Sequence, residues 1–487
     1  MSADTVEAAE RNARNPHDGD QRNSKKLNKK ELANALVETL SRQSPSKDAT
    51  KGEGLSSVPR ISEGSRLLRT LILGFALRLA ILTFSSDFIS HHLTTRVELS
   101  TPVTSYKRLV EGLYLAAHRI SPFDGGLFHQ SPLLLMLFKV PYAWLPQLFS
   151  DAIYAGTDVA TAMVLALIAA KKATLPAFAS RPLVPGETRF RCLPSTVALL
   201  YLFNPLTMAT CLARSSIIFS HLASVSALYF GIGGHIGYAS VFVAIATHLS
   251  LYPVMLIAPI SLIAAEQSSA SAAGQNQTRS RATGIAITLA KFAVAFASLH
   301  LLFAAIYGSE YFTATFDFTL RVSDLQPNVG LFWYFFIEIF DEFRPFFIAV
   351  FQLTALAFTV PISWRFRKDP LFGSIMLIGV ISALKSYPAW GDLSLFLGLV
   401  PLYEELIKYM QYTFLSANLI VFGVGLAPVF WYLWIEQGSG NANFFYAATL
   451  VYVFGQISLL FDLGSAMLRR ELDINCPEAR ERTVIQE

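Results

Sequence analysis

Charged side chains are scarce in this sequence and make up 15% of its 487 residues. A soluble globular chain carries about 25% charged residues, so this chain has too little charge to cover a surface exposed to water. Hydrophobic residues reach 53%, and phenylalanine alone occurs 38 times. Apolar runs of roughly 17–25 residues, long enough to cross a bilayer as helices, recur between residues 67 and 468. Because these runs are continuous, and a membrane barrel needs alternating strands, the sequence predicts an all-α polytopic membrane protein.

Cysteine is rare as well. Cys192, Cys211 and Cys476 have no partner at the spacing of a metal site or a redox motif. The topology predicted below places none of them in a luminal loop, so we predict no disulfide, and we expect no cysteine nucleophile. Four histidines and three acidic residues lie between residues 91 and 129, but their spacing is irregular for a metal site. We predict that the chain holds no metal ion and no cofactor.

The first 65 residues lack a long apolar segment and are poor in aromatic side chains. Such a segment cannot bury enough apolar surface to fold alone, so residues 1–65 are predicted to form a disordered basic tail. The first apolar run begins too late for a cleaved signal peptide, and we expect that run to insert the chain into the membrane. Residues 66–471 form the predicted membrane domain, and residues 472–487 form a short second tail.

Basic residues determine the predicted topology. The basic tail and the arginines around the first span place the N-terminus in the cytosol, and residues 86–149 then form the first luminal loop. Residues 131–149 are apolar, but their three prolines and their aromatic side chains favour an interfacial or broken helix. The basic stretches "WRFRKD" and "LRRE" then fall in the cytosol. We expect about twelve transmembrane helices, luminal juxtamembrane helices, and both termini in the cytosol.

Several segments of the predicted luminal regions are rich in glycine, asparagine and aromatic residues. They include "PNVGLFWYFFIEIF", "KSYPAWGD" and "LWIEQGSGNANFFYAATL". Together with five other blocks, in the same order along the chain, these segments resemble subunit U of the glycosylphosphatidylinositol (GPI) transamidase. The eight blocks occupy residues 105–113, 121–123, 128–134, 203–205, 249–253, 327–340, 385–392 and 433–450.

The resemblance implies a place in a complex of the endoplasmic-reticulum membrane. That complex removes a C-terminal hydrophobic signal from a proprotein and joins the new carboxyl group to the ethanolamine phosphate of a GPI lipid. The cysteine-protease nucleophile lies on a caspase-like subunit, so subunit U resembles a non-catalytic scaffold that helps to present the lipid. The implied partners are the other subunits, the GPI lipid and membrane lipids, with no nucleic acid. The implied fold is similar to the C-type glycosyltransferase membrane fold.

Two other classes of function compete with this interpretation. The family is also similar to polytopic mannosyltransferases that use a polyprenyl-phosphate mannose donor. Those enzymes carry paired acids after the first span, whereas "LTFSSDFISHHL" holds only Asp87. A transporter would place charges along a substrate path in the membrane, but the candidate charges are scattered and show no repeat between the halves of the chain. Helix packing or snorkelling is their expected use; they are Arg78, Arg214, Lys291, Lys385 and Asp392.

The connector "GSGNAN" between the last two predicted spans offers candidate ligand contacts. Asn441 and Asn443 each carry a hydrogen-bond donor and an acceptor, which suits sugar hydroxyls. Ser439 lies between two glycines that allow close backbone approach, and Phe444 follows the connector. We predict that these residues contact the GPI head group or a neighbouring subunit. The competing interpretation is ordinary turn chemistry, in which Asn443 caps the last helix.

Further candidates lie in the other predicted luminal segments. Trp333 and Tyr334 suit an interfacial aromatic belt, which is the favoured interpretation, or acyl-chain recognition. Lys107, Arg108 and Arg119 suit a solvated face, which is favoured, or contacts with lipid phosphates or an acidic partner. The remaining candidate contacts to GPI or to a partner are Asn328, Tyr387 and His129.

Overall fold

The computed structural model describes residues 62–85, 88–174, 192–270 and 277–479. Most of the predicted N-terminal tail, the end of the second tail and Asp87 lie outside these residues. Regular structure within the described ranges is helical throughout, which confirms the all-α class.

The helices follow one another along the chain with short connections. The longer α-helices are α2 (Glu63–Phe84), α6 (Gln147–Thr174), α13 (Gln277–Tyr307), α21 (Thr413–Trp431) and α22 (Ala442–Asn475). The shorter α-helices are α4 (Tyr106–Ala117), α5 (Pro132–Trp144), α8 (Pro194–Leu202), α9 (Pro205–Leu212), α10 (Ile217–Ile232), α11 (Ile236–Leu249), α12 (Ile257–Ala270), α14 (Glu310–Phe312), α15 (Phe318–Arg321), α16 (Phe332–Glu338), α17 (Arg344–Ala357), α18 (Thr359–Arg365), α19 (Pro370–Leu384) and α20 (Trp390–Leu399). Segments of 3₁₀- or π-helix are η1 (Ile89–Leu93), η2 (Tyr252–Leu256), η4 (Thr313–Asp317), η5 (Val400–Tyr409), η6 (Tyr432–Glu436) and η7 (Pro477–Ala479).

Prolines divide several of the apolar runs. Among the described residues, six helical segments are long and apolar enough to cross a membrane, with α17 and α18 taken together, and α8 and α9 form a further candidate span bent by 58°. Pro205 begins α9, Pro253 lies in η2 between α11 and α12, and Pro401 lies in η5 after α20. Because proline interrupts the helical hydrogen-bond ladder, these runs do not form long unbroken helices. The polytopic membrane class is confirmed, whereas the predicted count of about twelve spans is not.

Residues 131–149 do not form one helix. α5 has 13 residues, and at about 1.5 Å per residue it is too short to cross a hydrocarbon core of about 30 Å. Leu145 has an extended backbone (φ −118°, ψ 148°), Pro146 follows it, and α6 begins at Gln147. The break matches the predicted broken or interfacial helix.

Two of the predicted intramembrane arginines pair with acids on another helix. Arg78 donates through Nε to Asp158 at 2.6 Å, and both side chains are 0% exposed. Arg214 donates through Nε and Nη2 to the two carboxylate oxygens of Asp151, at 2.6 and 3.1 Å. These pairs attach α2 and the turn before α10 to α6, which confirms the packing role expected for both arginines. Lys291, on α13, is exposed.

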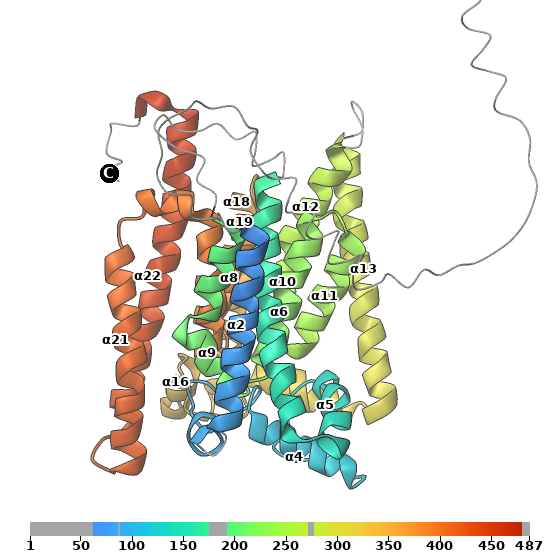
Figure 1. Ribbon diagram of the computed structural model, residues 1–487, viewed down its shortest axis with the longest axis vertical. Coiled ribbons are helices and arrows are strands. Elements are labelled where there is room, and N and C mark those ends of the chain that lie inside the picture. Colours follow the sequence, from blue (N-terminus) through green and yellow to red (C-terminus); the bar gives the residue numbers. More distant parts are fainter. Residues whose placement is uncertain (1–61, 86–87, 175–191, 271–276, 480–487) are drawn as a thin grey trace, which may run out of the picture. The chain divides into compact units, whose positions relative to one another are not determined.

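α4, α5, α16 and the turn between α21 and α22 lie at the same end of the described helices, the lower end in Figure 1. We call it the α4–α16 end. Most of the candidate contact residues lie in these segments or directly beside them in the sequence, so the positions of these helices determine the geometry of the candidate site.

Candidate functional site

The turn between α21 and α22 is closed by its own backbone. The carbonyl of Leu433 accepts hydrogen bonds from the N–H groups of Ser439 and Gly440, both at 3.0 Å. Gly438 has φ +62°, in the left-handed region that glycine adopts most easily. The glycines therefore end the preceding helix, and the exposed Ser439 hydroxyl lies 3.4 Å from the same Leu433 carbonyl.

Asn441 is the N-cap of α22. Its backbone is extended (φ −142°, ψ 173°), and its Oδ1 accepts from the N–H groups of Asn443 at 3.1 Å and Phe444 at 3.4 Å. A side chain that accepts from the first turn in this way stabilises the helix start. The interpretation of Asn443 as the cap is therefore wrong, because the helix begins at Ala442 and Asn443 lies within its first turn.

Asn443 connects α22 to α16. Its Oδ1 accepts a hydrogen bond from the Tyr334 hydroxyl. The Tyr334 ring stacks on Tyr446 at 4.6 Å between centroids and 27° between planes, and the Tyr446 hydroxyl donates to the Leu331 carbonyl at 3.1 Å. Asn443 is exposed, and none of the described residues accepts a hydrogen bond from its amide nitrogen. That nitrogen is a fixed donor open to a ligand.

Trp333 is buried inside an aromatic cluster. Its side chain is 1% exposed, and its ring centroid lies 6.0 Å from Phe445, 5.7 Å from Tyr446 and 6.3 Å from Trp434. The predicted interfacial belt is therefore wrong for Trp333, because α22 and η6 cover its ring. The half-buried Tyr334 lies at the edge of the cluster. Trp333 thus fixes α16 against α22.

A second group of candidates forms a column of three rings. Phe318 stacks on His129 at 3.6 Å and 10°, and on Tyr387 at 5.7 Å and 12°. The His129 Nδ1 lies 2.9 Å from the Ala314 carbonyl. Burial lowers the pKa of His129, and the hydrogen bond to the carbonyl, which raises it, does not outweigh burial. His129 is therefore a neutral ring at physiological pH and serves as a packing surface.

The Tyr387 hydroxyl joins this column to the loop before α16. It donates to the Asp324 carbonyl at 2.8 Å and accepts from the Asp324 N–H at 3.2 Å. Burial raises the pKa of Tyr387, so the hydroxyl keeps its proton and can donate. Because both bonds are made within the chain, Tyr387 fixes the loop and is not free to bind a ligand through its oxygen.

Arg108 is paired within the chain. Its Nη2 donates to the Asp324 carboxylate at 2.7 Å, and its Nη1 donates to the Leu127 carbonyl at 3.3 Å. The predicted solvated face is wrong for Arg108, because the loop that carries Asp324 lies against it. Lys107 and Arg119 are exposed, as predicted.

Asn328 shapes its own loop. Its side chain is 1% exposed; Oδ1 accepts from the Gly330 N–H at 2.8 Å, and Nδ2 donates to the Gln326 carbonyl at 3.1 Å. A Cβ added at Gly330 would lie 2.6 Å from ring atoms of Pro388, so only glycine lets this loop approach the α19–α20 turn so closely. Both functional groups of Asn328 are used within the loop.

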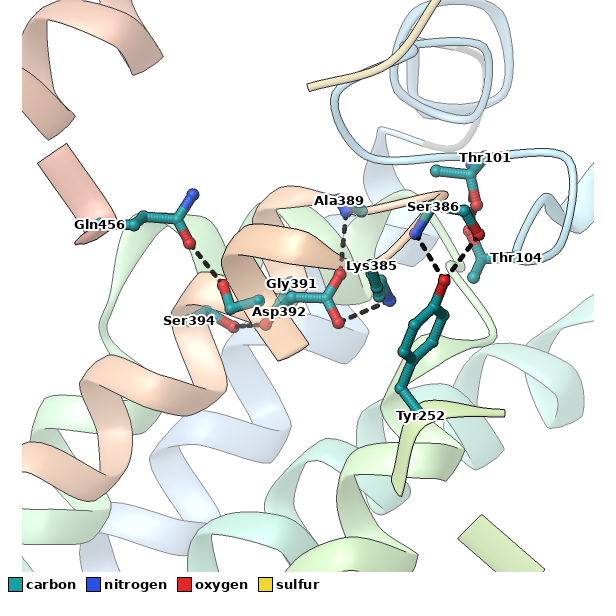
Figure 2. Close-up of polar contacts among 11 residues, drawn as sticks. Thr101, Thr104, Tyr252, Lys385, Ser386, Ala389, Gly391, Asp392, Ser394 and Gln456 are labelled. Carbon is teal, nitrogen blue, oxygen red and sulfur yellow. Dashed lines mark hydrogen bonds and ion pairs between the residues drawn. The ribbon is translucent and has the colours of Figure 1, made fainter. Parts of the chain in front are cut away.

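The turn between α19 and α20 contains a buried ion pair. Figure 2 shows the Lys385 ammonium and the Ala389 N–H converging on Asp392. The two donors lie 2.6 and 2.9 Å from the carboxylate oxygens. On the other side of the turn, the Ser386 N–H donates to the Tyr252 hydroxyl at 2.9 Å. Lys385 and Asp392 are 4% and 7% exposed. Their charges close the "KSYPAWGD" turn, which confirms the packing role expected for them.

A small polar cavity lies between this turn and the ring column. Its volume is about 30 Å³, and His129, His248, Tyr252 and Lys385 are among its lining residues. A water molecule occupies about 30 Å³ of liquid, whereas ligand pockets measure about 300–1,000 Å³. The cavity therefore has room for water and not for a sugar.

Few side chains among the described residues are suited to metal binding or to nucleophilic catalysis. Among them, no group of three or more His, Cys, Asp or Glu side chains is placed to hold a metal ion. Cys211 is buried in α9. Burial raises the pKa of Cys192 to about 11, so that thiol is protonated and poorly nucleophilic at neutral pH. Asp87, the acid on which the mannosyltransferase interpretation depends, lies outside the described residues.

α16 lies between the two groups of candidate residues. Phe332 packs with Phe318 and Tyr387 in one cluster, whereas Trp333 packs with Phe445 in another. The group of residues around Asn443 and the group around His129 therefore each contain side chains that pack against α16. Sequence reasoning missed Phe318 and the pairing of Arg108 with Asp324. Ring stacking and ion pairing between segments that are distant in the sequence leave no local pattern.

Comparisons with known proteins agree with the sequence blocks. The model of the family described as GPI transamidase subunit PIG-U matches residues 72–452. The GPI-anchor transamidase component PIGU of Mus musculus is 35% identical over 425 residues, which cover 83% of this chain and 94% of that protein. The GPI transamidase component GAB1 of Saccharomyces cerevisiae is 34% identical over 417 residues, which cover 85% and 97%.

A more distant similarity extends to a mannosyltransferase. The GPI mannosyltransferase 1 of Trypanosoma brucei brucei is 24% identical over 268 residues, which cover 55% of this chain and 57% of that protein. The predicted similarity to polytopic mannosyltransferases is thereby confirmed as a distant one. The PIG-U match, in contrast, spans most of the membrane domain and all three glycine- and aromatic-rich blocks up to residue 450. The chain belongs to the family of GPI transamidase subunit PIG-U.

Proposed function

We propose that the chain is a non-catalytic subunit of the GPI transamidase complex in the endoplasmic-reticulum membrane. In this role it holds the complex together and helps to present the GPI lipid for attachment to proproteins. The names of its relatives as transamidase components support the proposal. By the positive-inside rule, the α4–α16 end faces the lumen and both termini face the cytosol.

The exposed Asn443 amide is the observation that carries the lipid-presenting part of the proposal. Tyr334 fixes the Asn443 side chain, and the buried Trp333 fixes α16 beneath it. Ser439 and Phe444, 52% exposed, lie in the same connector. An amide and a hydroxyl bind sugar hydroxyls or a phosphate, and an exposed ring packs against the apolar face of a sugar or acyl chain.

The other candidates act by position. Asn441 starts α22, while Asn328, Tyr387 and His129 shape the loops on either side of α16. Because preorganised binding groups lose less entropy when a ligand arrives, this internal network lowers the cost of binding at Asn443.

Exposed apolar faces provide surfaces for other subunits and for lipid. Large side chains point outward on α21 and α17, among them Phe414 at 84%, Phe422 at 54% and Phe346 at 64% exposure. Helices in a membrane associate through van der Waals packing, and these exposed side chains are available for it. The proposed partners are the other transamidase subunits, including the caspase-like subunit that supplies the cysteine nucleophile.

Depletion of this protein from its own cells, followed by lipid analysis, tests the proposal. We expect complete GPI that carries ethanolamine phosphate to accumulate together with uncleaved proproteins. Accumulation of mannose-deficient precursors would instead support mannosyl transfer, the activity in the name of the trypanosome relative. An unchanged GPI profile would overturn both functions.

A further inference from the structure

A large cavity lies between α4, α5 and α13. Its volume is about 580 Å³, within the range of ligand pockets and far above the 30 Å³ of the polar cavity near Lys385. Most of its wall is apolar, with Leu113, Leu135 and Ile306 on the three helices. We call it the α4–α5–α13 cavity.

Two basic side chains line this cavity. They are Arg119, in the turn after α4, and Lys139, on α5. Both are exposed, and within the described part of the chain neither side chain has an ion pair or a hydrogen bond. No acidic residue is among those that line the cavity. An apolar pocket with two uncompensated positive charges is complementary to an anionic amphiphile.

The backbone at Arg119 adds an independent observation. Arg119 has φ +62°, and the Ile120 N–H donates to the Leu115 carbonyl at 3.0 Å. This is the helix-ending motif in which glycine is strongly preferred. An arginine adopts the left-handed conformation only at an energetic cost relative to glycine. Its side chain has no partner within the described chain to offset that cost, and such outliers often mark binding positions.

The surroundings of the cavity are apolar and exposed. Only 6% of the apolar part of α13 is buried, and Ile306 and Ile120 at the cavity are 51% and 53% exposed. Trp144, at the end of α5, is 82% exposed, and the nearby Tyr142 is 39% exposed. Exposed tryptophan and tyrosine side chains are typical of the membrane interface. These side chains favour a position of the cavity at the membrane interface.

The cavity is separate from the proposed GPI contact. In Figure 1, α13 and α5 lie on the opposite side of the view from α21 and α22. A lipid in the cavity would therefore lie apart from the proposed contact at Asn443, and the inference does not depend on that contact.

We propose that the α4–α5–α13 cavity binds one anionic membrane phospholipid. Arg119 and Lys139 hold its phosphate and charged head group, Tyr142 and Tyr307 border the polar part, and one acyl chain lies along α13. The bound lipid connects α4 and α5 to the membrane-spanning helices. It thereby supports the loop that carries His129.

The test uses the full-length chain purified in detergent. Phosphatidylinositol or phosphatidylcholine with the same acyl chains is added, bound lipid is counted by native mass spectrometry, and the melting temperature is recorded. We expect one phosphatidylinositol to be retained and to raise the melting temperature, with no such rise from phosphatidylcholine. Equal stabilisation by both lipids would overturn the anionic selectivity.

Two variants and a matched control test the residues. Arg119→Gly and Lys139→Gln should each weaken phosphatidylinositol binding about tenfold, the effect of one lost charge-assisted contact. Arg119→Gly also relieves the left-handed strain, so its melting temperature without lipid should be equal or higher. Lys107→Gln removes an exposed charge from α4 outside the cavity and should bind as the unchanged protein does. Unchanged binding by the combined Arg119→Gly and Lys139→Gln variant would overturn the proposal.

Discussion

Replacing Asn441 and Asn443 separately distinguishes a helix cap from a ligand contact. Asn441→Ala removes the acceptor for two N–H groups at the start of α22, and loss of an N-cap costs about 1 kcal/mol. Asn443→Ala removes one bond to Tyr334 at an exposed position, where water replaces the lost partner and the cost is about 0.5 kcal/mol. The cap should therefore matter more for stability than Asn443.

For GPI attachment the order should be reversed, so that Asn443 matters more than Asn441. If the Asn443 amide donates to the glycolipid, its loss removes about 1.4 kcal/mol of binding, which corresponds to a factor of about ten. The assay is the amount of GPI attached to a reporter proprotein, divided by the amount of assembled complex recovered with the tagged chain. Asn443→Ala should lower this ratio, whereas Asn441→Ala should lower complex and attachment together.

Two further variants provide controls. Asn441→Ser keeps a good cap and should behave as the unchanged protein. Tyr334→Phe removes the same internal hydrogen bond as Asn443→Ala but leaves the Asn443 amide in place, no longer fixed, so attachment per complex should fall less than in Asn443→Ala. An equal loss in Tyr334→Phe would refute direct contact and assign Asn443 to positioning, as would full attachment in Asn443→Ala.

Three other predictions follow from buried or half-buried groups. Asp158→Ala leaves Arg78 buried without its partner and should destabilise the chain by about 3–5 kcal/mol; replacement of both residues by leucine should lower the melting temperature less. Gly330→Ala places a Cβ against the Pro388 ring and should cost about 1–3 kcal/mol, measured as a lower melting temperature, and an unchanged value would contradict this close approach. Because burial holds the pKa of His129 below its usual 6.5, the unfolded chain takes up the proton first. The stability contributed by neutral His129 is complete above that usual value and declines as pH falls through it. His129→Phe keeps the ring stack, so the melting temperature of this variant should fall less on acidification than that of the unchanged protein. An equal fall would contradict a role of His129 protonation in the loss of stability.

The membrane class was predictable from the sequence because it follows from composition. Continuous apolar runs and scarce charge have one physical solution in a long chain, a set of membrane helices. Breaks in those helices were predictable where proline occurs, as at residues 131–149. The number of spans was not, because Pro253 and Pro401 leave short helical pieces whose tilt depends on their neighbours.

Partners of buried side chains were less predictable. The sequence shows Arg78 as a costly charge in an apolar run, but its partner Asp158 is 80 residues away. Trp333 shows the same difficulty, since an aromatic residue near a membrane can face lipid or protein, and only the packing of α16 against α22 separates the two. Predicting the cap required knowing where α22 begins, because a shift of one or two residues changes which asparagine is the cap.

Activity measured on the purified protein separates a subunit of the transamidase from a mannosyltransferase. The chain is isolated through a tag, once with its native partners and once alone, and both samples are assayed for GPI transfer to a proprotein and for mannose transfer from a lipid donor. We expect GPI transfer by the sample with partners, including a cysteine-protease subunit, and neither activity in the chain alone. Mannose transfer by the chain alone, or the absence of transamidase subunits from the purified sample, would contradict this expectation.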